Sequence, residues 1–266
     1  MPLAVVPTPI GNLEDITLRA LRVLGEADLV ACEDTRRTGR LLAHYGIRAE
    51  LLAYHEHNER RLAPRLAERA ASEKVALVSD AGMPLVSDPG YRLIRACIER
   101  GVRVEVLPGP SALVAALVAS GLPADTVVFC GFAPRGGRGR EELLRRIGRE
   151  EATFVLFESP RRLEGFLAEL PPEAPVAVCR EMTKLHEEVF RGTAGEAARR
   201  FSGGVRGEVV LVVRGGTSPG EPSLEEAVAL ARSYVEEGES PSRAAARAAR
   251  ETGRSRREIY GRLAAG

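Results

Sequence analysis

Four turns rich in glycine, proline, serine or aspartate are the segments of this 266-residue chain best suited to chemistry. Each follows a short apolar run, and they cover residues 7–12 (PTPIGN), 33–36 (EDTR), 79–90 (SDAGMPLVSDPG) and 108–111 (PGPS). Such residues favour turns for backbone reasons alone, yet two of these turns also carry carboxylates that a turn does not require. In a parallel sheet, turns that follow strands gather at the carboxyl ends of the strands, where ligands bind. The four turns therefore predict one binding cleft.

Several common binding motifs are absent from the sequence. Neither of the two lysines, Lys74 and Lys184, follows a glycine as in a phosphate-binding P-loop. No GxGxxG follows the first apolar run, which excludes the standard dinucleotide fingerprint. His55 and His57 could supply two metal ligands, but no third ligand lies close in sequence. We therefore expect no metal site and interpret both histidines as polar loop residues that line a surface or a cleft.

The elements that must position these turns alternate between short apolar runs and helical periodicity. Apolar runs predict strands at residues 3–6, 29–32, 51–54, 75–78 and 102–107. Apolar residues at helical spacing predict helices at residues 16–24, 38–44, 59–72, 91–98 and 111–119. This alternation predicts an α/β fold whose largely parallel sheet is covered on both faces.

A second set of elements follows a break at residues 121–126. β-branched, closely spaced strands are predicted at residues 127–131, 153–157, 176–179, 188–191 and 208–213, which favours a mixed sheet. Helices are predicted between them at residues 139–148, 160–169 and 194–201, and beyond a glycine-rich segment at 215–220 they are predicted at 223–237, 242–252 and 255–264. The sequence thus predicts two α/β domains, at 1–120 and 121–216, and a small helical extension at 217–266.

Composition excludes several classes of protein. The chain has 38 basic residues, of which 36 are arginines, and 37 acidic residues, so the net charge of +1 indicates no partner. Its four cysteines lie far apart without a CxxC pair, as expected for reduced thiols. The most apolar stretch, residues 113–132, is interrupted by Pro123 and Asp125, and the N-terminus lacks the basic region of a signal peptide. We therefore expect a cytoplasmic protein without a membrane segment.

Positive charge is concentrated near the C-terminus. Residues 240–266 hold seven arginines and two glutamates, a local charge of +5, which leaves −4 for the rest of the chain. Short helices with arginines on several faces are typical of appendages that contact nucleic acid. The alternative is a solvated helix pair in an arginine-rich chain. A second basic cluster favours nucleic acid, and it comprises Arg135, Arg138, Arg140, Arg145, Arg146 and Arg149.

The turns and their neighbours also resemble a known family. The motifs that carry the resemblance are, in order, PTPIGNLEDITLRAL, EDTRRTGRLL, YHEHNE, SDAGMPLVSDPG, PGPSAL, FCGFAPR, FESPRRL and REMTKLHEEVFRG. They resemble the 16S ribosomal RNA (cytidine-2′-O)-methyltransferases, the ribosomal small-subunit methyltransferase I family within the tetrapyrrole methylase superfamily. The resemblance covers residues 3–215, and the tail from residue 223 is similar to that family's helical extension. It implies a homodimer of two-domain α/β chains, with S-adenosylmethionine in the cleft between the domains.

The resemblance also implies roles for individual residues. In the first domain, Asp80 would face the ammonium group of S-adenosylmethionine, and the expected cofactor residues are Pro9, Ser79, Asp80, Ala81, Gly82, Met83, Pro84, Ser87, Pro108, Ser111 and Ala112. In the second domain they are Phe157, Glu158, Gly207 and Val209. Pro9 opens a Pro-Ile-Gly-Asn sequence where tetrapyrrole methylases have Gly-Pro-Gly-Asp, which argues against a porphyrinoid substrate.

The implied reaction is 2′-O-methylation of a cytidine ribose in the decoding region of 16S rRNA, free or in the 30S subunit. A ribose hydroxyl is a poor nucleophile while protonated, and the general-base candidates are Glu33, Asp34 and Lys184, with Glu181 and His186 nearby in the same motifs. The residues expected to contact RNA are Arg36, His55, His57, Arg135, Arg138, Arg180, Arg243, Arg247, Arg254 and Arg257. Glu33 and Asp34 could instead cap a helix. Two other functions stay open: C-methylation of a small tetrapyrrole, and non-catalytic RNA binding during ribosome assembly.

Overall fold

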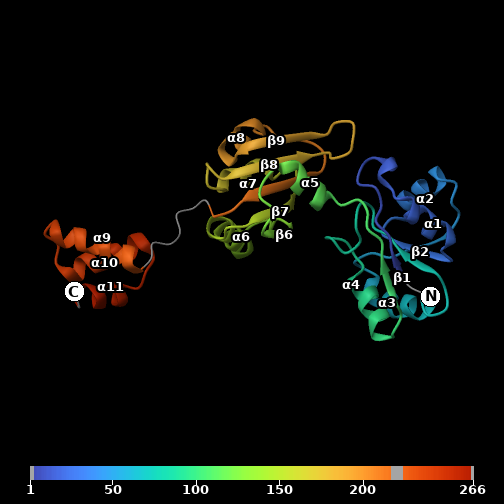
Figure 1. Ribbon diagram of the computed structural model, residues 1–266, viewed down its shortest axis with the longest axis horizontal. Helices are drawn as coiled ribbons and strands as arrows, with labels where there is room; N and C mark the ends of the chain where they lie inside the picture. The colour runs from blue at the N-terminus through green and yellow to red at the C-terminus, as the bar shows by residue number, and fades with distance from the viewer. Residues whose placement is uncertain (1–2, 217–223, 265–266) are drawn as a thin grey trace.

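The computed structural model describes residues 3–216 and 224–264. In these residues the chain forms two five-stranded sheets, each with its own helices, and a separate group of C-terminal helices (Figure 1). The α/β class and the helical extension predicted from the sequence are confirmed.

All strands of the first sheet run parallel, in the order β3-β2-β4-β1-β5. They are β1 (Leu3–Val5), β2 (Leu29–Cys32), β3 (Glu50–Ala53), β4 (Val75–Leu77) and β5 (Val104–Val106). The connecting helices are η1 (Leu13–Asp15), α1 (Leu18–Glu26), α2 (Thr35–His44), α3 (Glu59–Arg69) and α4 (Tyr91–Glu99). Because successive strand residues face opposite sides, one apolar cluster packs under α1 and α2 and another under α3 and α4. This arrangement confirms the predicted sheet with helices on both faces.

The second sheet is mixed, in the order β6-β7-β10-β8-β9. Only β6 and β7 pair in parallel, and the other neighbours are antiparallel. The strands are β6 (Val127–Phe132), β7 (Thr153–Glu158), β8 (Pro175–Arg180), β9 (Glu188–Thr193) and β10 (Val209–Arg214). Its main apolar cluster packs under α6 (Gly137–Arg149), α7 (Leu163–Glu169) and α8 (Ala194–Arg200). The mixed sheet expected from the sequence is therefore confirmed.

Helix α5 (Ala112–Ser120) packs on the other face of this second sheet. Its Ala116 is fully buried in a cluster with Val155 and Val210, and the Cys179 Sγ lies 3.8 Å from the Ala116 carbonyl oxygen. The sequence places the first boundary after residue 120, whereas the structure places α5 with the strands that follow it. A helix that is apolar on every side carries no sequence signal for the sheet it covers.

The C-terminal helices α9 (Leu224–Glu236), α10 (Pro241–Thr252) and α11 (Arg256–Ala264) pack around their own small core. Figure 1 shows them apart from both sheets. Part of the predicted glycine-rich boundary, residues 217–220, lies outside the described residues, as does residue 223. None of the helices in the described ranges combines the length and the apolar character that crossing a bilayer requires.

The buried core of the second sheet gives a direct stability prediction. Leu156→Ala removes a fully buried side chain and leaves a cavity, so we expect the free energy of unfolding to fall by about 2–5 kcal/mol in urea titration. Leu185→Ala is the control, because that side chain is 93% exposed and its loss should change stability by less than about 0.5 kcal/mol. Equal effects of the two substitutions would contradict the described packing.

Candidate functional site

A cavity of about 410 Å³ is lined by the turns that follow β1 and β4 of the first sheet, by the start of α5, and by strand and loop residues of the second sheet. The lining residues are Ile10, Ala81, Gly82, Met83, Val86, Ser87, Asp88, Ser111, Ala112, Phe132, Phe157, Glu158, Ser159, Pro160, Gly207, Glu208, Val209 and Val210. Most of the residues that the sequence analysis assigned to the cofactor are among them. The structure therefore brings residues 81–88 and 207–210, which lie more than 100 positions apart in the chain, to the same cavity.

Two backbone hydrogen bonds fix the turn at residues 79–90, which forms much of the cavity wall. Thr8 N donates to Gly82 O and Gly82 N donates to Thr8 O, each at 2.9 Å. Gly82 has a φ of +79°, which a residue with a side chain rarely adopts. Leu85 and Ser87 nevertheless have φ values of +74° and +68°, and such conformations cost about 1–3 kcal/mol each. Backbone strain of this kind is typical of binding sites.

Asp88 is a cavity residue that the sequence analysis did not single out. Burial, with a contribution from the nearby Glu33 and Asp80 carboxylates, raises the pKa of its carboxyl group to about 6, against a hydrogen bond with Ser79 that lowers it. The carboxylates thus place negative potential beside an apolar cavity, which suits a cationic ligand. The sequence signal was the second aspartate of SDAGMPLVSDPG, at residues 79–90.

Asp80 does not line this cavity. Its Oδ1 accepts a hydrogen bond from Asp34 N at 3.0 Å, and its Oδ2 lies 3.4 Å from Arg37 Nη1. With Ser79 and Pro9 it lines a second cavity of about 430 Å³, whose other residues are Thr8, Leu13, Arg37, Thr38, Arg40 and Leu41. Pro84 and Pro108 line neither cavity. The carboxylate expected to face the cofactor is thus placed on the far side of the turn.

Two of the three predicted bases follow β2. Asp34 is the N-cap of α2, because its carboxylate accepts a hydrogen bond from Arg36 N at 2.8 Å, and that bond lowers its pKa. Burial raises the pKa of Glu33, and the Asp80 carboxylate raises it further. A carboxylate with a raised pKa is the stronger base, so Glu33 is better suited than Asp34 to accept a proton.

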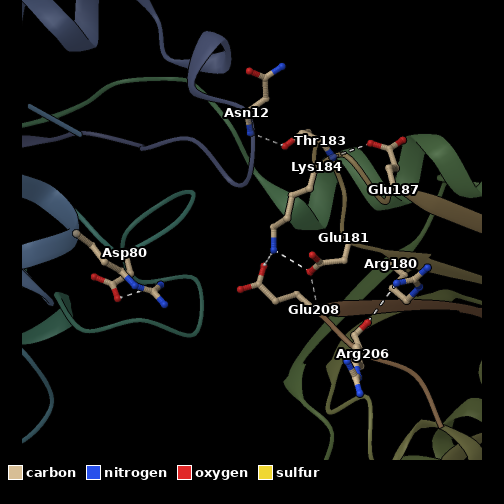
Figure 2. A network of polar contacts seen from close by, with 10 residues as sticks. Asn12, Asp80, Arg180, Glu181, Thr183, Lys184, Glu187, Arg206 and Glu208 are labelled. Atoms are coloured by element: carbon tan, nitrogen blue, oxygen red, sulfur yellow. Dashed lines mark hydrogen bonds and ion pairs between the residues drawn. The ribbon is translucent and has the colours of Figure 1, made fainter. Parts of the chain in front are cut away.

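Lys184, the third predicted base, lies between two carboxylates (Figure 2). Its Nζ is 2.8 Å from Glu181 Oε1 and 2.9 Å from Glu208 Oε2. Burial opposes the charge on Lys184, but the hydrogen bonds with Glu181 and Glu208 outweigh burial and raise its pKa. The ammonium group therefore keeps its proton at neutral pH, which makes Lys184 the least suited of the three bases.

The loop that carries Lys184 also contacts the first half of the chain. Asn12 N donates a hydrogen bond to Thr183 Oγ1 at 3.0 Å (Figure 2). A Cβ on Gly11 would lie 2.5 Å from Lys184 Cγ, so this approach of the two backbones requires glycine. These contacts join the two halves through loops that neighbour the first cavity.

The predicted RNA-contacting residues fall into two groups. Five arginines are exposed, namely Arg36, Arg135, Arg138, Arg243 and Arg257, whereas Arg254 is half-buried. Arg180 is held by Glu188, with Nε and Nη2 at 3.0 and 2.8 Å from Oε2. Arg247 is held by Glu239 and Glu251 at 2.8 and 3.2 Å and lies over the Tyr234 ring, 3.9 Å from its centroid. Arg180 and Arg247 are thus engaged inside the chain, which differs from the phosphate contacts expected of them.

The basic cluster at residues 135–149 is also partly engaged with carboxylates. Arg140 is buried, donates two hydrogen bonds to Glu169 at 2.8 and 2.9 Å, and lies 4.7 Å from the centroid of the Phe166 ring. On the surface of α6, Arg145 pairs with Glu142 and Arg146 pairs with Glu150. Much of the positive charge read from this segment is therefore neutralised locally.

His55 and His57 stack edge to face, with ring centroids 5.9 Å apart. Nε2 of His55 lies 3.2 Å from Asn58 Nδ2, and its buried Nδ1 has no hydrogen-bond partner among the described residues. Across residues 3–216 and 224–264, no group of three or more histidine, cysteine, aspartate or glutamate side chains is arranged to hold a metal ion.

Comparison with known proteins gives consistent matches. The family model described as Tetrapyrrole (Corrin/Porphyrin) Methylases matches residues 2–198. A Synechocystis protein named ribosomal RNA small subunit methyltransferase I is 42% identical over 97% of this chain and 95% of its own. The Thermotoga maritima protein of the same name is 47% identical over 80% of this chain and 98% of its own.

Solved structures of lower identity share the fold. A uroporphyrin-III C-methyltransferase from Thermus thermophilus aligns with a TM-score of 0.56 at 24% identity, over 81% of this chain and 94% of its own. A diphthine synthase aligns with a TM-score of 0.60 at 19% identity, over 80% of this chain and 90% of its own. At these identities the likeness concerns the fold alone.

The buried Asp88 carboxylate predicts a pH-dependent stability. Its pKa of about 6 lies above the ordinary value of 3.8, so the folded chain binds the extra proton and this group destabilises the fold increasingly as pH rises from 4 to 6. Asp88→Asn removes that penalty. In urea titrations, the stability of the variant relative to the unaltered chain should therefore increase by about 1–2 kcal/mol between pH 4 and pH 7, after discounting for partial exposure.

Asp125→Asn is the matched control, because Asp125 is exposed and outside both cavities. Its stability should stay within about 0.5 kcal/mol of that of the unaltered chain. A stability difference for Asp88→Asn that does not change with pH would contradict the partly buried position of this carboxylate near Glu33 and Asp80.

Proposed function

The chain belongs to the tetrapyrrole (corrin/porphyrin) methylase family, and from that premise we propose that it is an S-adenosylmethionine-dependent methyltransferase. We propose as its reaction the 2′-O-methylation of a cytidine in the decoding region of 16S rRNA. The relatives at 42–47% identity, named ribosomal RNA small subunit methyltransferase I, support an RNA of the small ribosomal subunit as substrate. The observation that carries the proposal is the cavity of about 410 Å³, which both halves of the chain line and which has Asp88 in its wall.

The residues of this cavity fit S-adenosylmethionine, which when bound supplies an electrophilic methyl group on a sulfonium. Asp88, with Glu33 and Asp80 behind it, provides the negative potential that suits the cationic end of the molecule. The side chains of Phe157 and Val209 provide apolar surface for the adenosine. The Gly82 backbone, tied to Thr8, would lie close to the amino acid part.

Glu33 would accept the proton of the ribose 2′-hydroxyl on its carboxylate. Of the three candidate bases it alone has a raised carboxyl pKa, since Asp34 caps α2 and Lys184 is held as an ammonium. Alignment of the acceptor oxygen with the methyl group supplies the larger part of such catalysis. Glu33 therefore adds to a reaction that positioning already favours.

Exposed arginines and the separate C-terminal helices would contact the RNA around the acceptor nucleotide. Arg243 and Arg257 lie exposed on α10 and α11 and carry positive charge without a core role.

We further propose a homodimer in the cytoplasm. Large exposed apolar side chains support an interface, namely Val114 and Val118 on α5, Phe132 on β6, and Tyr91 and Ile98 on α4.

Methyl transfer tests the proposed function. Incubation with methyl-labelled S-adenosylmethionine and unmodified 30S subunits, or naked 16S rRNA, should place label in 2′-O-methylcytidine after nuclease digestion. Absence of label in RNA, with cofactor binding seen by calorimetry, would contradict the RNA substrate and favour a small acceptor such as a tetrapyrrole. Absence of cofactor binding would favour a non-catalytic RNA-binding protein.

Glu33→Gln tests the proposed base. We expect kcat for methyl transfer to fall by about 10²–10⁴-fold, because general-base catalysis contributes that much, while the Kd for S-adenosylmethionine changes little. Glu14→Gln is the control, because Glu14 is exposed in η1, whereas Glu33 is partly buried near Asp80. An unchanged kcat for Glu33→Gln would contradict the role of Glu33 as a base and would leave alignment of the substrates as the source of catalysis.

The C-terminal arginines predict a change in salt dependence. Replacing Arg243 and Arg257 with alanine should weaken RNA binding and reduce the slope of log Kd against log salt concentration by about 0.7–0.9 per lost phosphate contact. Arg65→Ala, an exposed substitution on α3, should leave the slope unchanged. An unaltered slope in the double variant would show that the helical extension does not bind the RNA backbone.

A further inference from the structure

The second cavity, of about 430 Å³, is not used by the cofactor assignment above. We propose that it binds the acceptor ribonucleotide of the RNA, with Arg37 and Arg40 of α2 holding phosphate groups beside the reacting ribose. This inference rests on the proposed function and assigns a place to its second substrate.

The position of the second cavity supports this assignment. The turn after β4 separates the two cavities, since Ser79 and Asp80 line the second and residues 81–83 line the first. The turn after β1 is divided in the same way, with Thr8 and Pro9 on the second cavity and Ile10 on the first. The two cavities therefore adjoin along the turns after β1 and β4. Because methyl transfer requires direct contact between the acceptor oxygen and the methyl group, the phosphates would lie in the second cavity and the ribose 2′-hydroxyl would extend past the edge of these turns toward the donor.

The charges of the second cavity fit a phosphodiester. Two cationic residues, Arg37 and Arg40, and one anionic residue, Asp80, line this cavity, so the wall carries a net positive charge. The Arg37 side chain is 57% exposed, and its contact with Asp80 is 3.4 Å long, so the guanidinium can turn to a ligand. The Arg40 side chain donates to Arg36 O, at 3.4 Å from Nε. One guanidinium group can donate hydrogen bonds to two oxygens of the same phosphate, and such contacts position an RNA backbone.

The remaining wall fits the sugar and the base. Leu13, Leu41 and Pro9 give the second cavity an apolar side, and Thr8 and Thr38 place hydroxyl groups in it. Asp80 acts as a positioning residue, because its carboxylate holds both Arg37 and the backbone of Asp34 at the start of α2. Arg37 and Arg40 differ from Arg180 and Arg140, whose guanidinium groups each donate two hydrogen bonds to a glutamate.

Arg40→Ala is the principal test, with Arg37→Ala as a second variant. With unmodified 30S subunits as substrate, we expect KM for the RNA to rise about 10–100-fold in each, as for loss of a charged hydrogen bond. The calorimetric Kd for S-adenosylmethionine should stay within twofold. Arg40→Lys should recover part of the affinity, because it keeps the charge but loses the planar fork.

Arg48→Ala is the matched control. Arg48 is exposed beyond the far end of α2 and before the amino end of β3, away from both cavities, so KM should not change. An RNA KM within twofold of the unaltered chain in Arg40→Ala and Arg37→Ala would overturn the assignment while leaving the proposed function intact. A parallel loss of cofactor affinity would overturn it by joining the second cavity to the cofactor site. No transfer to RNA by the unaltered chain would overturn the proposed function and the assignment together.

Discussion

The pair of backbone hydrogen bonds between Thr8 and Gly82 is the contact on which the arrangement of the site depends. It fastens the turn after β4 to the turn after β1, although 74 positions separate the two residues in the chain. Only a parallel sheet with β1 beside β4 brings these turns to the same edge. The hydroxyl groups of Thr8 and Ser79 reinforce this main-chain pair, because they donate to Ser79 O and Gly82 O at 3.1 Å each.

The fixed turn divides the site into two environments of opposite character. On one side, burial raises the pKa values of Asp88 and Glu33, neighbouring carboxylates add to both shifts, and the group creates negative potential at the wall of an apolar cavity. On the other side, the arginines of α2 outnumber the single carboxylate of Asp80. A cationic methyl donor and an anionic RNA acceptor have complementary charges to these two environments. The proposed division of the substrates follows from this difference in charge.

The sequence predicted the elements and their sheets well, because strands and helices depend on local periodicity. It also predicted that turns after parallel strands form the site, but the turns at residues 7–12 and 79–90 line two cavities rather than one, and residues 33–36 line neither. It did not predict which side of a turn each side chain faces, so it did not show that Asp80 and Asp88 line different cavities. The pairing of Arg180 with Glu188 and of Arg247 with Glu239 depends on tertiary packing, and a count of charges does not contain it. The sheet on which α5 packs could not be predicted either, because its surface is apolar on nearly every side and so does not indicate which side is buried.

A crystal structure of the complex with S-adenosylhomocysteine would show which cavity holds the cofactor. We expect the adenosine against Phe157 and Val209, with the amino acid end beside the turn at residues 79–90 and near Asp88. We also expect the cavity lined by Arg37 and Arg40 to stay open to the second substrate. Adenosine bound between Pro9, Arg37 and Asp80 instead would contradict the division of the site and reassign both cavities.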